Sequence, residues 1–148
     1  MRADFHVIGL PIPQGSQVYS TTKDGRAFGR YANAQHLMAW REQVAQAAWR
    51  HTNGEQFTGP VQVKVLFYFD RPKSHYNSKE LLKPTAPQCI TKKPDIDKIS
   101  RAVLDALESA VLMDGDETVV GLYASKHWAD DHPQGCHIII ETIEGLTT

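Results

Sequence analysis

The sequence predicts a single α/β domain over residues 1–148, with a mixed β-sheet and two main helices. The length of 148 residues is typical of one domain that buries its own core. The most strand-like segment, VQVKVLFYF at 61–69, is β-branched and aromatic, and it lies between two stretches with helical periodicity. Strands and helices that alternate along one chain favour the α/β class.

The two helices are predicted from apolar residues that recur every 3.6 positions. The first covers about 34–51, with Asn33 at the N-cap position and Leu37, Trp40 and Val44 on its apolar side. The second covers about 95–111. Its apolar stripe consists of Ile96, Ile99, Val103, Ala106, Leu107 and Ala110. Its polar side carries Asp97, Arg101, Asp105 and Glu108, at spacings of four, four and three.

The remaining strands are shorter and are bounded by turn residues. We expect them at 5–9, in a hairpin over 17–30 that turns at Asp24-Gly25, and at 118–128 and 136–144. A hairpin centred on His132 would place His127 opposite His137. No cysteine pair accompanies these histidines, so a zinc site is disfavoured.

The net charge of −1 hides a polarised chain. Residues 1–93 contain thirteen basic and six acidic residues, whereas residues 94–148 contain three basic and eleven acidic residues. An asymmetry of this kind suggests that one part faces a polyanion while the other needs its carboxylates. The alternative is a folded protein in which the two signs of charge interleave in space.

The basic residues are concentrated in two irregular regions. The segment 71–94 runs for 24 residues without periodicity, and Glu80 is its only acidic residue. The predicted hairpin mixes basic residues with aromatic ones, a combination that suits phosphates and bases. The candidate DNA-binding residues are Lys23, Arg26, Arg30, Arg71, Lys73, Lys92, Lys93, Lys98 and Lys126. The alternatives are aromatic residues that simply pack and a solvated linker.

Three aspartates form the candidate metal site. Asp95 and Asp97 flank the start of the second helix, and Asp116 follows that helix in a turn. Carboxylates without sulfur or imidazole suit a hard cation, so we expect Mg²⁺, with Mn²⁺ as a substitute. Such an ion supplies an activated water for phosphodiester hydrolysis. Arg101, one turn after Asp97, is the candidate group for holding the scissile phosphate.

Ordinary structural roles explain the same residues. Asp95 is also a good N-cap, and Asp97 suits the positive end of a helix. Asp97, Arg101 and Asp105 also fit a surface ladder of ion pairs. The acids of DGDE at 114–117 are also common turn residues.

Composition also bounds the location of the protein. No apolar run approaches the length of a membrane span, and the first residues lack a signal-peptide pattern. Cys89 and Cys136 have no CxxC partner, which favours the reducing cytoplasm. We expect neither a membrane partner nor a small organic cofactor.

At the carboxylates the sequence resembles the RusA family of Holliday-junction resolvases. The resemblance is carried by KPDIDKISRAVLDAL at 93–107 and DGDETVV at 114–120, and also by IGLPIPQG at 8–15 and FYFDRPKSHY at 67–76. It implies a homodimeric, Mg²⁺-dependent endonuclease, symmetric or intertwined, that resolves four-way DNA junctions by paired nicks. By position, Asp95 and Asp97 match the family's D-x-D ligands and Asp116 its downstream acid, with Asp114 as the alternative. Arg101 stands where a catalytic basic residue, often lysine, is expected.

Two other functions fit part of the pattern. A noncatalytic branched-DNA-binding protein would use the same basic residues, with the acids serving as helix caps. A metal-dependent phosphohydrolase of small nucleotides would use the acids, and its affinity for substrate would depend little on salt.

Overall fold

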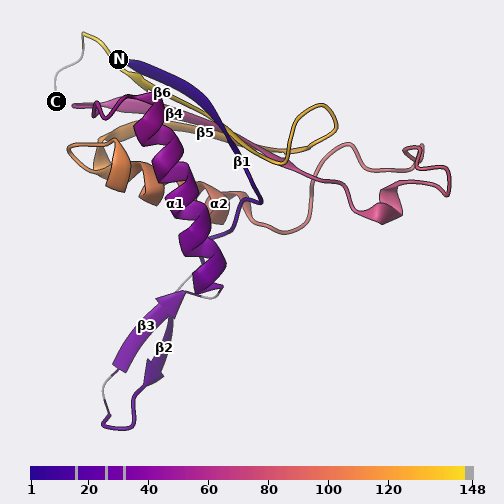
Figure 1. The fold of residues 1–148 in the computed structure, drawn as a ribbon, viewed down its shortest axis with the longest axis horizontal. Helices are drawn as coiled ribbons and strands as arrows, with labels where there is room; N and C mark the ends of the chain where they lie inside the picture. Colours follow the sequence, from indigo (N-terminus) through magenta and orange to yellow (C-terminus); the bar gives the residue numbers. More distant parts are fainter. Residues whose placement is uncertain (16, 26, 32, 146–148) are drawn as a thin grey trace.

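A four-stranded mixed β-sheet forms the body of the domain, and two helices cover one of its faces (Figure 1). The computed structural model describes residues 1–15, 17–25, 27–31 and 33–145. The sheet strands are β1 (Arg2–Ile8), β4 (Val61–Phe69), β5 (Val119–Trp128) and β6 (Gly135–Thr142). The helices are α1 (Ala34–His51) and α2 (Ile96–Ala110). The predicted α/β class with a mixed sheet and two main helices is therefore confirmed.

The strand order is β1-β6-β4-β5, with β4 parallel to β5 and the other two pairings antiparallel. The expected hairpin between the last two strands is wrong, because β4 lies between β5 and β6. His137 pairs with His6 on one side and Leu66 on the other, whereas His127 lies beside Tyr68. The chain leaves β4, crosses through α2 and returns as β5, a crossover connection of the kind that a parallel pair requires.

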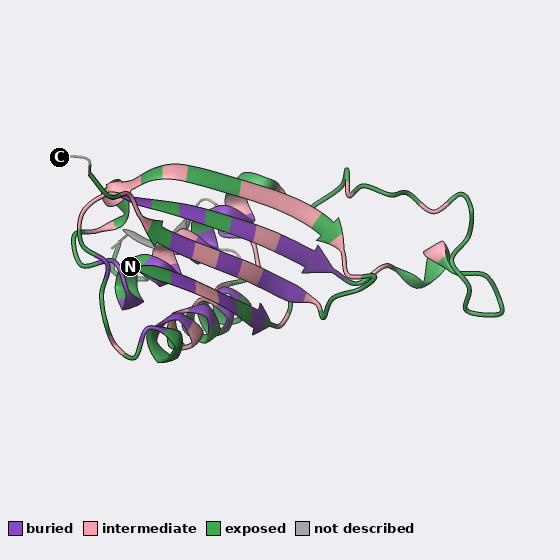
Figure 2. Cartoon of the chain, turned by 90° about the horizontal axis from the view of Figure 1, so that it is seen from above, coloured by how far each residue is buried: buried purple, intermediate pink, exposed green. Residues whose placement is uncertain are grey.

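The core lies between the sheet and the helices. Alternate residues of β4, from Val61 to Phe67, are at most 2% exposed, as expected for a strand with one face on the core. Figure 2 shows this alternation of buried and exposed residues along the strands. The helices contribute fully buried side chains such as Leu37 and Val44 from α1, and Val103 and Leu107 from α2. This packing fixes which side of each helix faces solvent.

Both helices have the predicted extent, but neither uses the expected side-chain cap. Asn33 occupies the N-cap position of α1 in a left-handed conformation, with φ 58°, and makes no capping hydrogen bond. Asp95 occupies the N-cap position of α2, also without a capping hydrogen bond. The Asp95 carboxylate is therefore available for other partners.

Two segments project from this body (Figure 1). The hairpin of β2 (Gln17–Thr21) and β3 (Ala27–Tyr31) extends beyond the start of α1, as the Asp24-Gly25 turn predicts. The segment 71–94 extends from the end of β4 and contains one short 3-10 helix, η1 (Lys73–His75); Figure 2 shows it as almost entirely exposed. Both segments belong to the basic part of the sequence.

Candidate active site

A cleft of about 640 Å³ lies along the solvent side of α2. Asp97, Arg101 and Asp105 reach it together because residues four apart share one face of a helix. The opposite side of α2 is held in the core by Ile99, Val103 and Leu107, so this polar side cannot turn away from the cleft. Ile96, predicted to belong to the apolar stripe, is instead 38% exposed. The complete lining is Gln14, Ile96, Asp97, Ser100, Arg101, Leu104, Asp105, Asp116, Leu122 and Ala124.

Asp116 enters the cleft from the turn that follows α2. It begins the short 3-10 helix η2 (Asp116–Thr118), directly after Gly115 in a left-handed conformation with φ 91°. This φ value favours glycine, because L side chains rarely adopt it. Asp114 faces elsewhere, and its Oδ2 accepts a hydrogen bond from the Gly59 amide at 3.2 Å. Of these two acids, Asp116 is therefore the one that lines the cleft.

The carboxylates in and around the cleft fall into two groups. Oxygen atoms of Asp105, Glu108 and Asp116 all lie within 4.8 Å of one another, a spacing suited to one metal ion. In the described part of the chain, no group of three possible ligands with this spacing contains Asp95 or Asp97. The predicted trio of Asp95, Asp97 and Asp116 therefore has two members in the cleft lining and one beside it.

Asp95 is engaged by lysines. Its Oδ2 lies 3.2 Å from the Lys93 ammonium and 3.4 Å from the Lys98 ammonium. The hydrogen bond from Lys93 is the main reason that the pKa of Asp95 falls below its usual value, and Lys98 adds to the effect. These contacts are exposed to water, which screens them, so the carboxylate remains free to change partners.

Two acids further along α2, Asp105 and Glu108, are also candidate metal ligands, although they lie outside the D-x-D motif. Asp105 and Glu108 were predicted to lie on the polar side of this helix, where a ladder of ion pairs explains them equally well. The structure brings Asp116 beside them, and none of the three acids has an ion-pair partner among the described residues. Their spacing on one helix face is the sequence feature that could have identified them.

Gln14 is a buried member of the cleft lining. Its side chain is 3% exposed, although it comes from the loop after β1 and is distant in sequence from α2. Its Nε2 donates a hydrogen bond to Oδ2 of Asp105, and its backbone amide donates to the Lys98 carbonyl at 3.0 Å. Its Oε1 is buried without a donor. The glutamine therefore joins the N-terminal loop to the acidic side of α2.

The predicted DNA-binding residues occupy different environments. Lys23 is exposed in the turn of the hairpin, and Lys73, Lys92 and Lys93 are exposed on the segment 71–94. Arg26 and the side chain of Arg30 lie outside the described residues. Lys126 donates hydrogen bonds to the carbonyls of Lys92 and Pro94, each at 2.9 Å. It therefore holds the end of the basic segment against β5, beside Asp95.

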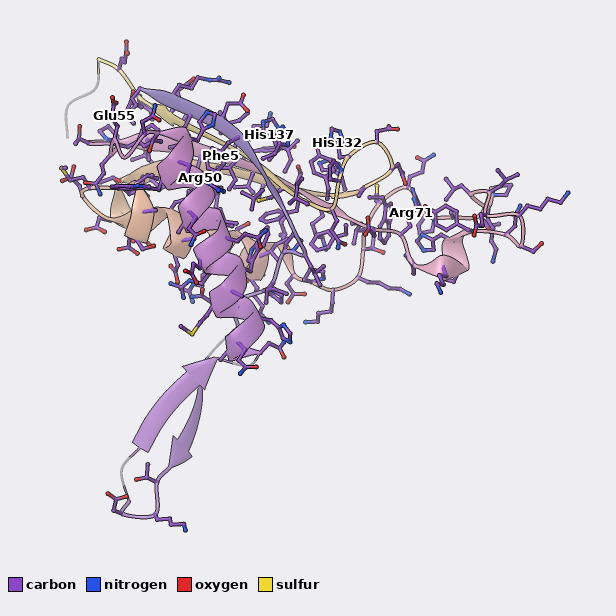
Figure 3. The ribbon with its side chains drawn as sticks, in the orientation of Figure 1. Phe5, Arg50, Glu55, Arg71, His132 and His137 are labelled. Atoms are coloured by element: carbon purple, nitrogen blue, oxygen red, sulfur yellow. The ribbon has the colours of Figure 1, made fainter. Side chains whose placement is uncertain are left out.

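Arg71 has a largely internal role. Its side chain is 5% exposed, and Nε and Nη2 donate to the Asp130 carboxylate at 2.7 and 3.1 Å. Nη1 donates to the Pro87 carbonyl at 2.7 Å, and the guanidinium lies over the Trp128 ring. Figure 3 shows Arg71 where the projecting segment leaves the sheet. The residue thus joins the start of that segment to Pro87 within it and to Asp130 in the loop after β5.

The fold and the cleft together define a small α/β protein with a group of carboxylates spaced closely enough to bind a metal ion. No helix in the described ranges has the length and apolar character needed to cross a membrane. The sequence matches the Endodeoxyribonuclease RusA family over residues 9–141. The chain therefore belongs to the RusA family.

A curated relative covers nearly the same length. The chain is 32% identical over 135 residues to the uncharacterized protein YqaN of Bacillus subtilis (strain 168). The alignment covers 86% of this chain and 88% of the relative. The relative therefore supports a shared fold over the whole domain without adding an activity.

Proposed function

We propose that this chain is a Mg²⁺-dependent, structure-selective DNA endonuclease that resolves four-way junctions by paired, symmetric nicks. The observation that carries the proposal is the cleft that Asp97, Arg101 and Asp116 line together in a member of the RusA family. Carboxylates bind hard cations and a guanidinium binds phosphate, so these residues can bind the two ligands side by side.

The donor set fits Mg²⁺, or Mn²⁺ in its place, because every candidate ligand is a carboxylate oxygen. Asp97 and Asp116 would hold the cation from the cleft lining, and Asp95 would join them when its carboxylate leaves Lys93 and Lys98. When bound, the cation supplies a water of lowered pKa and offsets negative charge on the phosphate.

Arg101 would bind the scissile phosphate. It lies one turn from Asp97 on the same side of α2, and it has no ion-pair partner among the described residues. Its planar guanidinium can donate two parallel hydrogen bonds to phosphate oxygens and so orient the ester for in-line attack. Lysine at this position would keep the charge but lose this geometry.

The exposed lysines of the two projections would contact the DNA backbone. Lys23 on the hairpin and Lys73, Lys92 and Lys93 on the segment 71–94 carry charge away from the body of the domain. Backbone contacts of this kind position a protein on DNA without reading its sequence. We propose a homodimer for this task, because two symmetric sites match the approximate two-fold symmetry of a four-way junction.

The test is a nicking assay on a synthetic four-way junction and a linear duplex of the same sequence, with and without Mg²⁺. The proposal expects paired nicks in the junction, dependent on Mg²⁺ or Mn²⁺, and little cleavage of the duplex. Asp97→Asn should retain junction binding and lose cleavage. Asp131→Asn, which changes an exposed acid in the loop after β5, should cleave normally.

The other two functions give different results in the same assay. A noncatalytic binding protein would shift the junction in a gel but would not cut it with either cation. A nucleotide phosphohydrolase would turn over mononucleotides and leave the junction intact. Either result would overturn the proposed function.

A further inference from the structure

We propose that Lys126 is a positioning residue for the metal site, because its ammonium group fixes the main chain from which Asp95 enters α2. The sequence predicts that Lys126 contacts DNA, whereas in the structure its ammonium bonds to the main chain of the protein itself. The inference rests on the proposed function, since Asp95 is one of the carboxylates proposed to hold Mg²⁺. It adds a residue of β5 to a site otherwise built from α2 and the turn after it.

Strand register brings Lys126 to this place. Lys126 pairs with Phe67 of β4, and Phe67 is fully buried on the side of the sheet that the helices cover. Residues that pair across neighbouring strands share one side of a sheet. Ala124, two residues earlier on β5, lies on the same side and lines the cleft. Lys126 therefore belongs to the side of β5 that faces the cleft and the start of α2.

The ammonium of Lys126 is engaged by two main-chain carbonyls. Its Nζ donates to the carbonyl oxygens of Lys92 and Pro94, each at 2.9 Å. Two of its three N–H donors are thus used, and hydrogen bonds from an ionised donor are stronger than those between neutral groups. The two carbonyls lie on either side of Lys93, and Pro94 directly precedes Asp95. Lys126 therefore ties the last residues before Asp95 to the sheet.

The position of Asp95 depends on this main chain more than on its own side chain. Its carbonyl accepts hydrogen bonds from the amides of Lys98 and Ile99 at 3.1 and 3.2 Å, so its backbone begins the first turn of α2. Its side chain makes no capping hydrogen bond, and its ion pairs with Lys93 and Lys98 are exposed to water, which weakens them. A metal ligand must be held to within about 0.5 Å of its working position. The bonds from Lys126 supply this restraint.

The first experiment compares Lys126→Met, which removes the donors and the charge, with Lys126→Gln, whose NH₂ group can donate to both carbonyls without a charge. Amide hydrogen exchange of Lys98 and Ile99, measured by NMR on the full-length protein without metal or DNA, reports the order of the first turn of α2. Exchange in Lys126→Met should be faster than in the wild type by about 10-fold or more. Lys126→Gln should recover part of this difference.

Cleavage of a four-way junction at saturating DNA gives a second readout. The Mg²⁺ concentration for half the maximal rate should rise by about 10-fold or more in Lys126→Met, while the rate at saturating Mg²⁺ stays within about 3-fold. The salt dependence of junction binding should not change. Lys64→Met serves as the matched control, because Lys64 is an exposed strand lysine on the other side of the sheet. Circular dichroism checks that each variant is folded.

The outcomes separate this inference from its rivals. Unchanged exchange with a smaller salt dependence of junction binding in both Lys126 variants would show that Lys126 contacts phosphate, and would overturn the inference. Faster exchange in Lys126→Met, in a protein that never cuts a junction, would refute the proposed function alone, because the exchange experiment contains neither metal nor DNA. Normal cleavage by the wild type with unchanged exchange in Lys126→Met would refute the inference alone.

Discussion

Asp95 at the start of α2 and the acidic residues toward its C-terminal end have opposite surroundings. At the N-terminal end, Asp95 lies between the ammonium groups of Lys93 and Lys98. Toward the C-terminal end, Asp105 and Glu108 meet Asp116 without any cationic side chain paired to them among the described residues. On this one helix, Asp95 is paired with lysines, whereas the acidic residues toward the other end have no cationic partner among the described residues. Arg101 lies between them.

This difference shows why a sequence motif is an incomplete guide to a metal site. The D-x-D pattern directs attention to the residues at the start of the helix, but the availability of a carboxylate depends on the charges that the fold places around it. The group of Asp105 and Glu108 is completed by Asp116, which arrives from a separate turn.

Asp116→Asn is expected to have the largest effect, because Asp116 lines the cleft with Asp97 and Arg101 and is the acid that the following turn brings to α2. Cleavage of a four-way junction in Mg²⁺ should fall by about 10²–10³, the usual range for losing one group that stabilises transition-state charge. Junction binding, measured by gel shift, should persist. Asp114→Asn is the informative comparison, since its side chain keeps an oxygen for the Gly59 amide. An equal loss of cleavage in Asp114→Asn would show that the wrong acid of this turn has been chosen.

Arg101→Ala should reduce cleavage by roughly 10²-fold, because it removes the guanidinium proposed to hold the phosphate. The same change should strengthen Mn²⁺ binding, since a positive charge leaves the surface between the two acidic groups. Arg101→Lys should restore part of the activity, because the charge returns without the planar donor pair. Single-turnover cleavage and Mn²⁺ titration measure the two effects. Weaker Mn²⁺ binding in Arg101→Ala would contradict this role.

The sequence predicted most of the fold because the helices and the central strand have strong periodicity. The segments 34–51 and 61–69 have the predicted bounds, since their apolar residues face one core. The pairing of the last two strands could not be predicted in this way. A loop of a few residues favours a hairpin between the two strands that it joins. In the structure, however, β4 pairs with β5 along one edge and with β6 along the other, so the two strands do not pair with each other.

The site was predictable to the extent that it lies on one helix. The common face of Asp97, Arg101 and Asp105 follows from their spacing alone. The contact between Gln14 and Asp105 joins residues 91 positions apart, and only tertiary packing creates it. The lysine partners of Asp95 are near in sequence, but their effect depends on how the chain enters the helix.

Arg71→Gln should destabilise the basic segment 71–94, which leads into the N-terminal end of α2, without affecting the C-terminal end of this helix. It removes the ion pair with Asp130 and the hydrogen bond to Pro87, so the free energy of unfolding should fall by about 1–3 kcal/mol. Urea denaturation measures this change, and Lys73→Gln on the exposed part of the segment should stay within about 0.5 kcal/mol. If Arg71→Gln leaves stability intact and only lowers the salt dependence of DNA binding, the arginine is a direct phosphate contact instead.

The smallest expected effect concerns the pKa of Asp95. Replacing Lys93 and Lys98 by alanine removes the hydrogen bonds and charges that lower this pKa, so it should rise toward the ordinary value of 3.8. A carboxyl whose pKa is lower in the folded protein than in the unfolded chain stabilises the fold above the unfolded pKa. That contribution is lost as the pH falls through the folded pKa. The double variant should therefore lose part of the acid dependence of stability between about pH 5 and pH 2.

Carbon-detected NMR of the Asp95 carboxyl measures this pKa directly, and Lys79→Ala, distant on the projecting segment, is the control. An unchanged pKa in the double variant would mean that the two lysines do not neutralise Asp95. The contrast between the two ends of α2 would then disappear, and Asp95 would be as available to a cation as Asp105. If the pKa rises as expected, the lysines compete with metal for this carboxylate. Their removal should then strengthen Mn²⁺ binding at the N-terminal end of α2.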